Sequence, residues 1–161
     1  MQRFNVRHSV TAVFLLASPL AAGAQAPRVE FLAPQLTRGQ PVPFSEAVRV
    51  GDMLYLSGMM GTKPNTMELV PGGIEAEAKQ ALENIRIILK GAGGVVTDIV
   101  KCTVMLDDIT KWSAFNRVYL EFFGTHRPAR SAFGVDGLAL GGAVEIECIA
   151  VAKPASGPAR R

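Results

Sequence analysis

The spacing of apolar residues along the chain predicts a hairpin near the start of the folded part. Residues 44–50 and 53–57 are short apolar runs bounded by turn residues, which is typical of β-strands. Gly51 and Asp52 lie between the two runs, and this pair favours a tight turn. Residues 61–73 follow as a loop that contains Pro64 and Pro71.

A helical period begins at Ile74. From there apolar residues recur on one face, while charged residues occupy the remaining positions. Gly91, Gly93 and Gly94 are expected to end this helix. They do not resemble a phosphate-binding loop, because they follow a helix instead of opening one. The predicted apolar face consists of Ile74, Ala78, Ala81, Leu82, Ile85, Ile88 and Leu89.

In the second half of the chain, segments with the residue pattern of a strand alternate with segments that have the apolar spacing of a helix. Branched residues over 98–106 predict a third strand, and residues 110–123 predict a second helix. Residues 129–135 and 143–150 predict the last two strands. This order predicts an α+β fold, a mixed β-sheet with two α-helices packed on one face. The second helix carries an aromatic stripe, whose helical spacing favours core packing over a stacking platform: Trp112, Phe115, Tyr119 and Phe122.

The ends of the chain differ from its middle. Residues 1–24 combine Arg3 and Arg7, an apolar stretch and a closing Ala-Gly-Ala, which is typical of a secretory signal peptide. The apolar stretch is shorter than the roughly 20 residues that span a membrane, so a stable membrane anchor is the weaker alternative. We therefore expect a periplasmic or secreted protein, cleaved near Ala24.

The rest of the chain is expected to form one domain. Residues 25–42 are rich in proline and predict an irregular N-terminal arm, residues 43–153 the domain itself, and residues 154–161 a flexible tail. Removal of Arg3 and Arg7 lowers the net charge of +3 by two, so the charge gives no reason to expect nucleic acid as a partner.

The cysteines allow two interpretations. Cys102 and Cys148 lie in apolar strand patterns, where buried free thiols are common, although an oxidising compartment would allow them to pair. Because a disulfide has strict geometric demands, the sequence favours free thiols. His126 is the only histidine after residue 24, and no Cys and His spacing resembles a metal site, so no metal is expected.

Charged residues in the last two strands are candidates for chemistry. Period two places Glu145 and Glu147 on the face opposite the apolar residues of their strand. A solvated sheet face would account for Glu147. Arg130 follows a proline at the start of its strand, where a lone arginine is more often a surface residue than a ligand.

These two strands resemble the signature of the RidA/YjgF family, the reactive intermediate deaminases. The signature covers residues 127–135 and 143–151, with Pro-Ala-Arg-Ser at 128–131. Five further segments match in the same order, so the resemblance covers about residues 43–153: 43–48, 56–58, 80–85, 98–101 and 115–123.

The resemblance implies a fold, an assembly and an activity. Family members have a chorismate-mutase-like fold and form homotrimers with sites at the subunit interfaces. They hydrolyse small 2-imino or enamine acids to 2-keto acids and ammonia, without a metal or organic cofactor. The expected ligand is therefore a small 2-imino or 2-keto acid.

The family motifs also imply roles for single residues. Arg130 matches the arginine that binds the substrate carboxylate, and Glu145 matches the catalytic glutamate. A guanidinium holds a carboxylate through two parallel hydrogen bonds, and a carboxylate can orient the attacking water or move its proton. Ser57 and Asn116 match further site residues, although Ser57 as an ordinary strand-end residue stays equally open.

Gly58 would let backbone N–H groups approach the ligand closely. Phe44 stands where many deaminating members have a tyrosine, and Ala132 replaces a frequent cysteine. The alternative function is therefore a non-catalytic module that binds small carboxylates or a partner on the same trimeric scaffold. RNA cleavage, which has been attached to some relatives, is disfavoured because the chain has neither a histidine pair nor a basic face.

Overall fold

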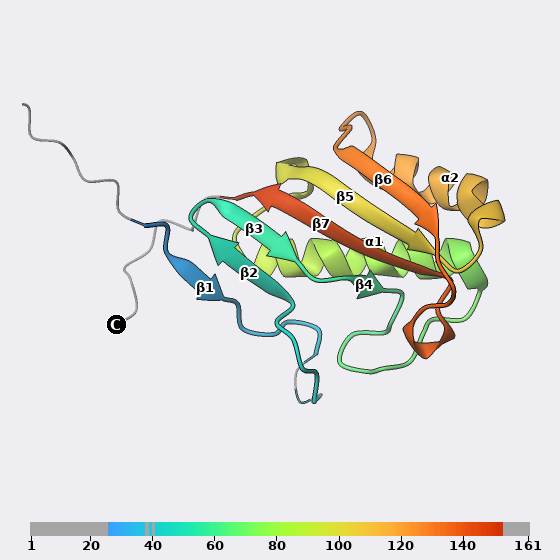
Figure 1. Ribbon diagram of the computed structural model, residues 1–161, viewed down its shortest axis with the longest axis horizontal. Helices are drawn as coiled ribbons and strands as arrows, with labels where there is room; N and C mark the ends of the chain where they lie inside the picture. Colours follow the sequence, from blue (N-terminus) through green and yellow to red (C-terminus); the bar gives the residue numbers. More distant parts are fainter. Residues whose placement is uncertain (1–25, 38, 40, 153–161) are drawn as a thin grey trace, which may run out of the picture.

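The computed structural model describes residues 26–37, 39 and 41–152. The predicted signal peptide and the predicted tail lie outside these residues. The described chain forms one mixed sheet with two helices on a single face, which lie behind the sheet in the view of Figure 1. This confirms the predicted α+β class.

The sheet is antiparallel except for one strand pair. Its order is β1-β2-β3-β7-β5-β6, and β4 also pairs with β7. The neighbours β5 and β6 run parallel, because α2 connects them. The strands are β1 (Val29–Phe31), β2 (Ala47–Val50), β3 (Met53–Leu56), β4 (Met59–Met60), β5 (Ile99–Leu106), β6 (Ala129–Gly134) and β7 (Val144–Val151).

The two helices bury most of the faces that their apolar period predicts. In α1 (Gly73–Gly91), the predicted stripe from Ala78 to Leu89 is buried. In α2 (Trp112–Phe123), Phe115 and Tyr119 are buried as predicted. Trp112, however, is 41% exposed, and Phe123 is buried where the predicted stripe had Phe122. Phe122 packs at the margin of the core, and its ring meets that of Phe123 edge to face.

The prediction of an irregular N-terminal arm is wrong in part. Strand β1 lies within it and pairs with β2. Farther along, the buried carboxylate of Glu46 accepts hydrogen bonds from the backbone N–H groups of Gln35, Leu36 and Thr37, at 2.7, 2.8 and 2.6 Å. A three-residue strand whose side chains are all exposed has no apolar period by which the sequence could reveal it.

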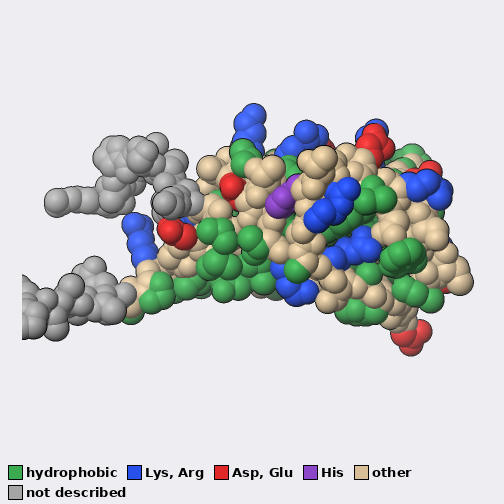
Figure 2. Space-filling view, turned by 90° about the horizontal axis from the view of Figure 1, so that it is seen from above, with side chains coloured by type: hydrophobic (Ala, Val, Ile, Leu, Met, Phe, Trp, Pro, Cys, Tyr) green, Lys and Arg blue, Asp and Glu red, His purple; other side chains and the backbone are tan. Residues whose placement is uncertain are grey.

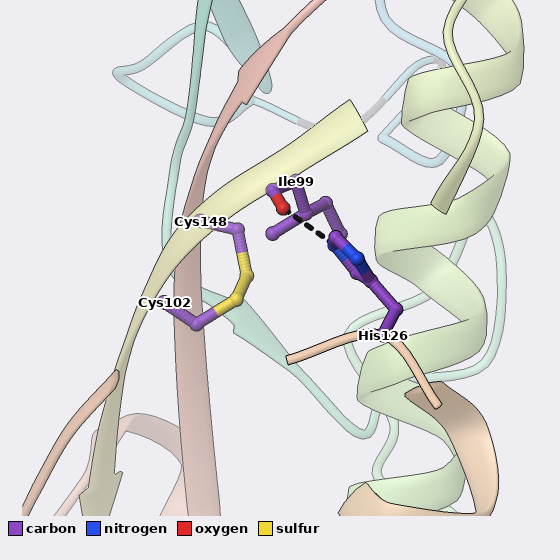
Figure 3. Close-up of a disulfide and its surroundings, with 4 residues drawn as sticks. All are labelled: Ile99, Cys102, His126 and Cys148. Atoms are coloured by element: carbon purple, nitrogen blue, oxygen red, sulfur yellow. Dashed lines mark hydrogen bonds between the residues drawn. A yellow bond between two sulfur atoms is a disulfide. The ribbon is translucent and has the colours of Figure 1, made fainter. Parts of the chain in front are cut away.

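The cysteines are also paired, contrary to the prediction of free thiols. Cys102 and Cys148 form a disulfide between β5 and β7, shown in Figure 3. The two residues lie directly opposite each other across the antiparallel ladder, and both side chains face the core. The alternation of residues indicates which face of its strand each cysteine occupies. The strand register that places the two cysteines opposite each other depends on how the sheet is assembled.

The other face of the sheet carries no helix within the described residues. It has charged residues in its middle, including Glu145, Glu147 and Lys101, and apolar residues over β1 to β3 and at other positions. Large apolar side chains on this open face stay exposed, among them Val29, Phe31, Tyr55, Phe133 and Val151. Seen along the plane of the sheet, hydrophobic side chains gather on the side away from the helices, at the lower edge of Figure 2. A contiguous apolar surface of this kind is typical of a protein interface. No helix of the described part is long and apolar enough to cross a membrane.

Candidate functional site

Arg130 lies on the helix face of the sheet, at the edge strand β6. It is the register partner of Cys102 in the parallel pair of β5 and β6, so the two side chains share a face. Its Nη1 donates a hydrogen bond of 2.7 Å to Oδ1 of Asn116 on α2. The structure therefore brings together two predicted site residues that lie fourteen positions apart.

The aromatic stripe of α2 surrounds this arginine. The guanidinium carbon lies 4.6 Å from the ring centroid of Tyr119, 5.7 Å from that of Trp112 and 5.8 Å from that of Phe115. Aromatic faces at these distances attract a cation. The helical spacing of the stripe predicted core packing alone, whereas one side of the stripe also positions Arg130.

Arg130 has room for a further anionic partner. Within the described part of the chain no carboxylate forms an ion pair with it, and the side chain is only half-buried. The hydrogen bond to Asn116 occupies one terminal nitrogen. The guanidinium therefore keeps donors that can hold a ligand carboxylate.

Glu145 lies on the opposite face of the sheet. Buried and more exposed residues alternate along β7, and Glu145 and Glu147 share the open face as the sequence predicted. Glu145 borders a cavity of about 390 Å³ together with Phe44, Ser57 and Gly58. The structure thus brings these four predicted residues together.

A β-bulge shapes the chain beside Glu145. From Tyr55 to Met59 the strand advances by four residues, whereas its partner β7 advances by three, from Ile149 to Ile146. The extra residue falls near Gly58, between β3 and β4. A Cβ atom at Gly58 would collide with the Glu145 carboxylate, so a glycine is required for this close approach.

The environment of Glu145 favours its protonated form. Burial raises the pKa of Glu145 above its usual value, and the nearby charge of Glu147 raises it further. No donor among the described residues forms a hydrogen bond with its carboxylate. A carboxyl group with a raised pKa is a stronger base in its ionised form than an ordinary glutamate, which suits it to accept and return a proton.

Ser57 is hydrogen-bonded within the chain through both its side chain and its backbone. Its hydroxyl donates a hydrogen bond of 2.6 Å to the carbonyl oxygen of Ser45, and its backbone N–H donates one of 3.0 Å to the carbonyl oxygen of Glu46. The hydroxyl proton is therefore in use, and the oxygen remains available to accept a hydrogen bond.

Within one chain, the two groups of site residues are separate. Arg130 and Asn116 lie on the helix face at the β6 edge, and neither borders the cavity of Glu145. Strands β5 and β7 lie between β6 and the cavity strands β3 and β4 (Figure 1). The arm and the loops contribute cavity residues that the sequence analysis missed, including Leu36, Met67 and Leu140, because loop residues carry no period.

Comparison with known proteins identifies the family of this chain. The family model described as endoribonuclease L-PSP matches residues 37–152. The chain belongs to this family. A 2-iminobutanoate/2-iminopropanoate deaminase of Capra hircus is 52% identical over 112 residues, which cover 70% of this chain and 82% of that protein.

Solved structures of the family confirm the fold. RidA from an Antarctic Psychrobacter has a TM-score of 0.70 at 38% identity, and the match covers 76% of this chain and 98% of that one. TdcF from E. coli, crystallised with bound serine, has a TM-score of 0.69 at 34% identity, with coverage of 76% and 98%. The predicted resemblance to the RidA/YjgF family is thereby confirmed.

Proposed function

We propose that this protein is an imine deaminase that hydrolyses 2-imino acids to 2-keto acids and ammonia, at sites shared between neighbouring subunits. One observation carries the proposal: an arginine that pairs with no carboxylate of the described residues and a glutamate with a raised pKa lie on opposite faces of one sheet. The names of the most similar relatives agree with this reaction.

Arg130 binds the carboxylate of the substrate in this proposal. The hydrogen bond to Asn116 and the three aromatic rings hold the guanidinium before the ligand arrives. A preorganised guanidinium loses little conformational freedom when it forms paired hydrogen bonds. The bound carboxylate then fixes the position of the imine carbon.

Glu145 moves the protons of the reaction. Its carboxylate accepts a proton from water while the water oxygen bonds to the imine carbon and the C=N π electrons move to nitrogen. The protonated Glu145 then returns this proton to nitrogen, which gives a carbinolamine. Glu145 next accepts the hydroxyl proton and passes it to the same nitrogen, so that the C–N bond breaks as the carbonyl forms. Water and imine are consumed, and ammonia and the keto acid are released.

Three copies of the chain complete the sites. Much of the open sheet face is apolar and exposed in one chain, so burying these side chains against other copies removes them from water. A cyclic arrangement brings the Arg130 edge of one copy to the Glu145 cavity of the next. This assembly supports catalysis because each subunit alone holds the two groups apart.

Export is part of the proposal. Residues 1–24 have the pattern of a signal peptide, and the bridge between Cys102 and Cys148 supports an oxidising compartment, where disulfides persist. The substrates would then be imines that arise or arrive outside the cytoplasm.

A second candidate is binding without turnover. Phe44 has no hydroxyl at the cavity wall, and the Ser57 hydroxyl donates to Ser45, so few donors are left to position a water.

RNA cleavage has less support, since the ring of His126 is hydrogen-bonded to the carbonyl oxygen of Ile99 at 2.7 Å, as Figure 3 shows.

The test is a coupled assay in which an amino-acid oxidase supplies the imine and its loss is followed. Arg130→Ala should lower kcat/KM by about 100-fold or more, because two charge-assisted hydrogen bonds are lost. Arg117→Ala is the matched control, since this exposed arginine on α2 pairs with Glu75 instead of facing Arg130 or the cavity. Equal rates in wild type and Arg130→Ala would overturn the proposal.

A further inference from the structure

The cavity beside Glu145 is larger than the smallest 2-imino acids require. Its volume of about 390 Å³ lies in the range of pockets that enclose ligands of many more atoms. A substrate with a methyl side chain would leave most of this space empty. The walls therefore indicate which larger group fits.

These walls are mostly apolar. Glu145 is the only charged residue among the described residues that border the cavity. The amide nitrogen of Asn84 already donates to the carbonyl oxygens of Met60 and Thr62, at 3.0 and 2.9 Å. Among the threonines at the cavity, Thr66 donates its hydroxyl to the carbonyl oxygen of Lys63, whereas the buried Thr37 hydroxyl has no partner among the described residues. A large polar side chain would lose its hydration here for few hydrogen bonds in return.

Three large apolar side chains at the cavity remain half exposed. Phe44 is 50% exposed, Met67 48% and Leu140 47%. They come from the segment before β2, from the loop before α1 and from the loop before β7. Single exposed apolar residues are common, but three from separate segments on one cavity indicate an apolar ligand.

Leu140 is held there in an unusual backbone conformation. Its φ of 57° and ψ of 9° lie in the left-handed region, which glycine adopts far more readily than leucine. The neighbouring Gly137 and Gly141 also have positive φ angles. A leucine kept where glycine would fit better points to a role for its side chain.

We propose that this cavity receives the side chain of the substrate, and that the enzyme prefers 2-imino acids with apolar side chains of about four carbons or more. Leu140 and Met67 determine this specificity. The inference rests on the proposed function, in which Arg130 of a second subunit holds the carboxylate and the side chain points away from it into the cavity.

The experiment compares imines made by an amino-acid oxidase from leucine, methionine and alanine. The kcat/KM for the leucine-derived imine should exceed that for the alanine-derived imine by about 10-fold or more, since each well-packed methylene contributes to discrimination. Leu140→Asn should reduce this ratio toward one. Leu120→Asn is the matched control, because Leu120 is 51% exposed on α2, away from the cavity.

Leu140→Gly separates specificity from folding. Glycine relieves the left-handed backbone, so this variant should be as stable as wild type or more stable, and yet lose the preference for the leucine-derived imine. Lower stability with an unchanged substrate ratio would instead assign Leu140 a purely structural role and overturn the inference.

The remaining outcomes distinguish the two proposals. If the alanine-derived imine reacts as fast as the leucine-derived one, the inference fails while the proposed function stands. If no imine is consumed, the proposed function fails, and thermal stabilisation by keto acids decides the inference. Stronger stabilisation by 4-methyl-2-oxopentanoate than by pyruvate would support it, and equal stabilisation would overturn it.

Discussion

The two halves of the proposed site are built in different ways. Arg130 is held by one strand and by the aromatic face of one regular helix. The Glu145 cavity is built from a bulge, the N-terminal arm and two loops. Regular elements hold a side chain more rigidly than loops do, whereas loops change shape with fewer consequences for the fold.

This difference separates two tasks. Every 2-imino acid has the same carboxylate, so its binding group belongs on an element that does not vary. Substrates differ in their side chains, and the loop-built cavity is the part that can be adapted to them. We expect changes in the arginine half to affect all substrates equally and changes in the cavity half to affect them unequally.

The largest expected effect comes from joining the two halves across subunits. Arg130→Ala and Glu145→Gln should each be nearly inactive alone. Coexpression of both variants should restore activity to about a third of the wild-type rate, because each mixed cyclic trimer has one interface of its three at which both natural residues meet. The deaminase rate of the doubly tagged, copurified mixture measures this, and mixing the purified variants without subunit exchange is the control. No recovery would contradict the shared site.

Removing the disulfide tests the core beneath Arg130. Cys102→Ala combined with Cys148→Ala should lower the free energy of unfolding by about 2–4 kcal/mol, because the unfolded chain loses a cross-link. Denaturant unfolding at a fixed protein concentration measures this change. Wild type in a reducing agent is the control, because it lacks the bridge but keeps the natural sequence. Unaltered stability in both samples would mean that the bridge contributes nothing.

A smaller effect is expected at the aromatic rings around Arg130. Trp112→Leu removes a partly exposed ring and should raise KM about two- to five-fold, by the same factor for every 2-imino acid. Trp112→Phe keeps an aromatic face and should restore most of the loss. A change in KM that depended on the substrate side chain would show that Trp112 belongs to the cavity half instead.

The smallest expected effect is on pH dependence. Burial raises the pKa of Glu145 and the charge of Glu147 raises it further, so Glu147→Gln should lower this pKa. Activity that needs ionised Glu145 is lost as pH falls through its pKa, and the acid limb of kcat/KM should therefore move to lower pH. Glu68→Gln, at an exposed pair with Lys63, is the control.

The raised pKa also sets the sign of the effect on stability. The folded state binds the Glu145 proton more tightly than the unfolded chain does, so stability decreases as pH rises from the unfolded pKa to the folded one. Glu145→Gln should therefore be at least as stable as wild type at neutral pH, as measured by thermal unfolding. Lower stability would mean that the carboxylate has a structural partner.

Most of the regular elements could be predicted from the sequence because their signals are local. The period of α1, the alternation along β7 and the Gly51-Asp52 turn all lie within a few residues of the elements that they specify. Strands β1 and β4 were missed, since elements of three and two residues are too short to show a period. The family segments predicted candidate site residues for the same local reason.

The sequence by itself determined which chemical groups this protein has and on which side of its strand each one points. Only the tertiary structure decided which groups meet. Sheet order and register place Cys102 opposite Cys148 and bring Arg130 to Asn116, while Glu145 faces the other way into a cavity closed by loops. Contacts between distant segments depend on how the whole sheet is assembled, and no local pattern of residues encodes that assembly.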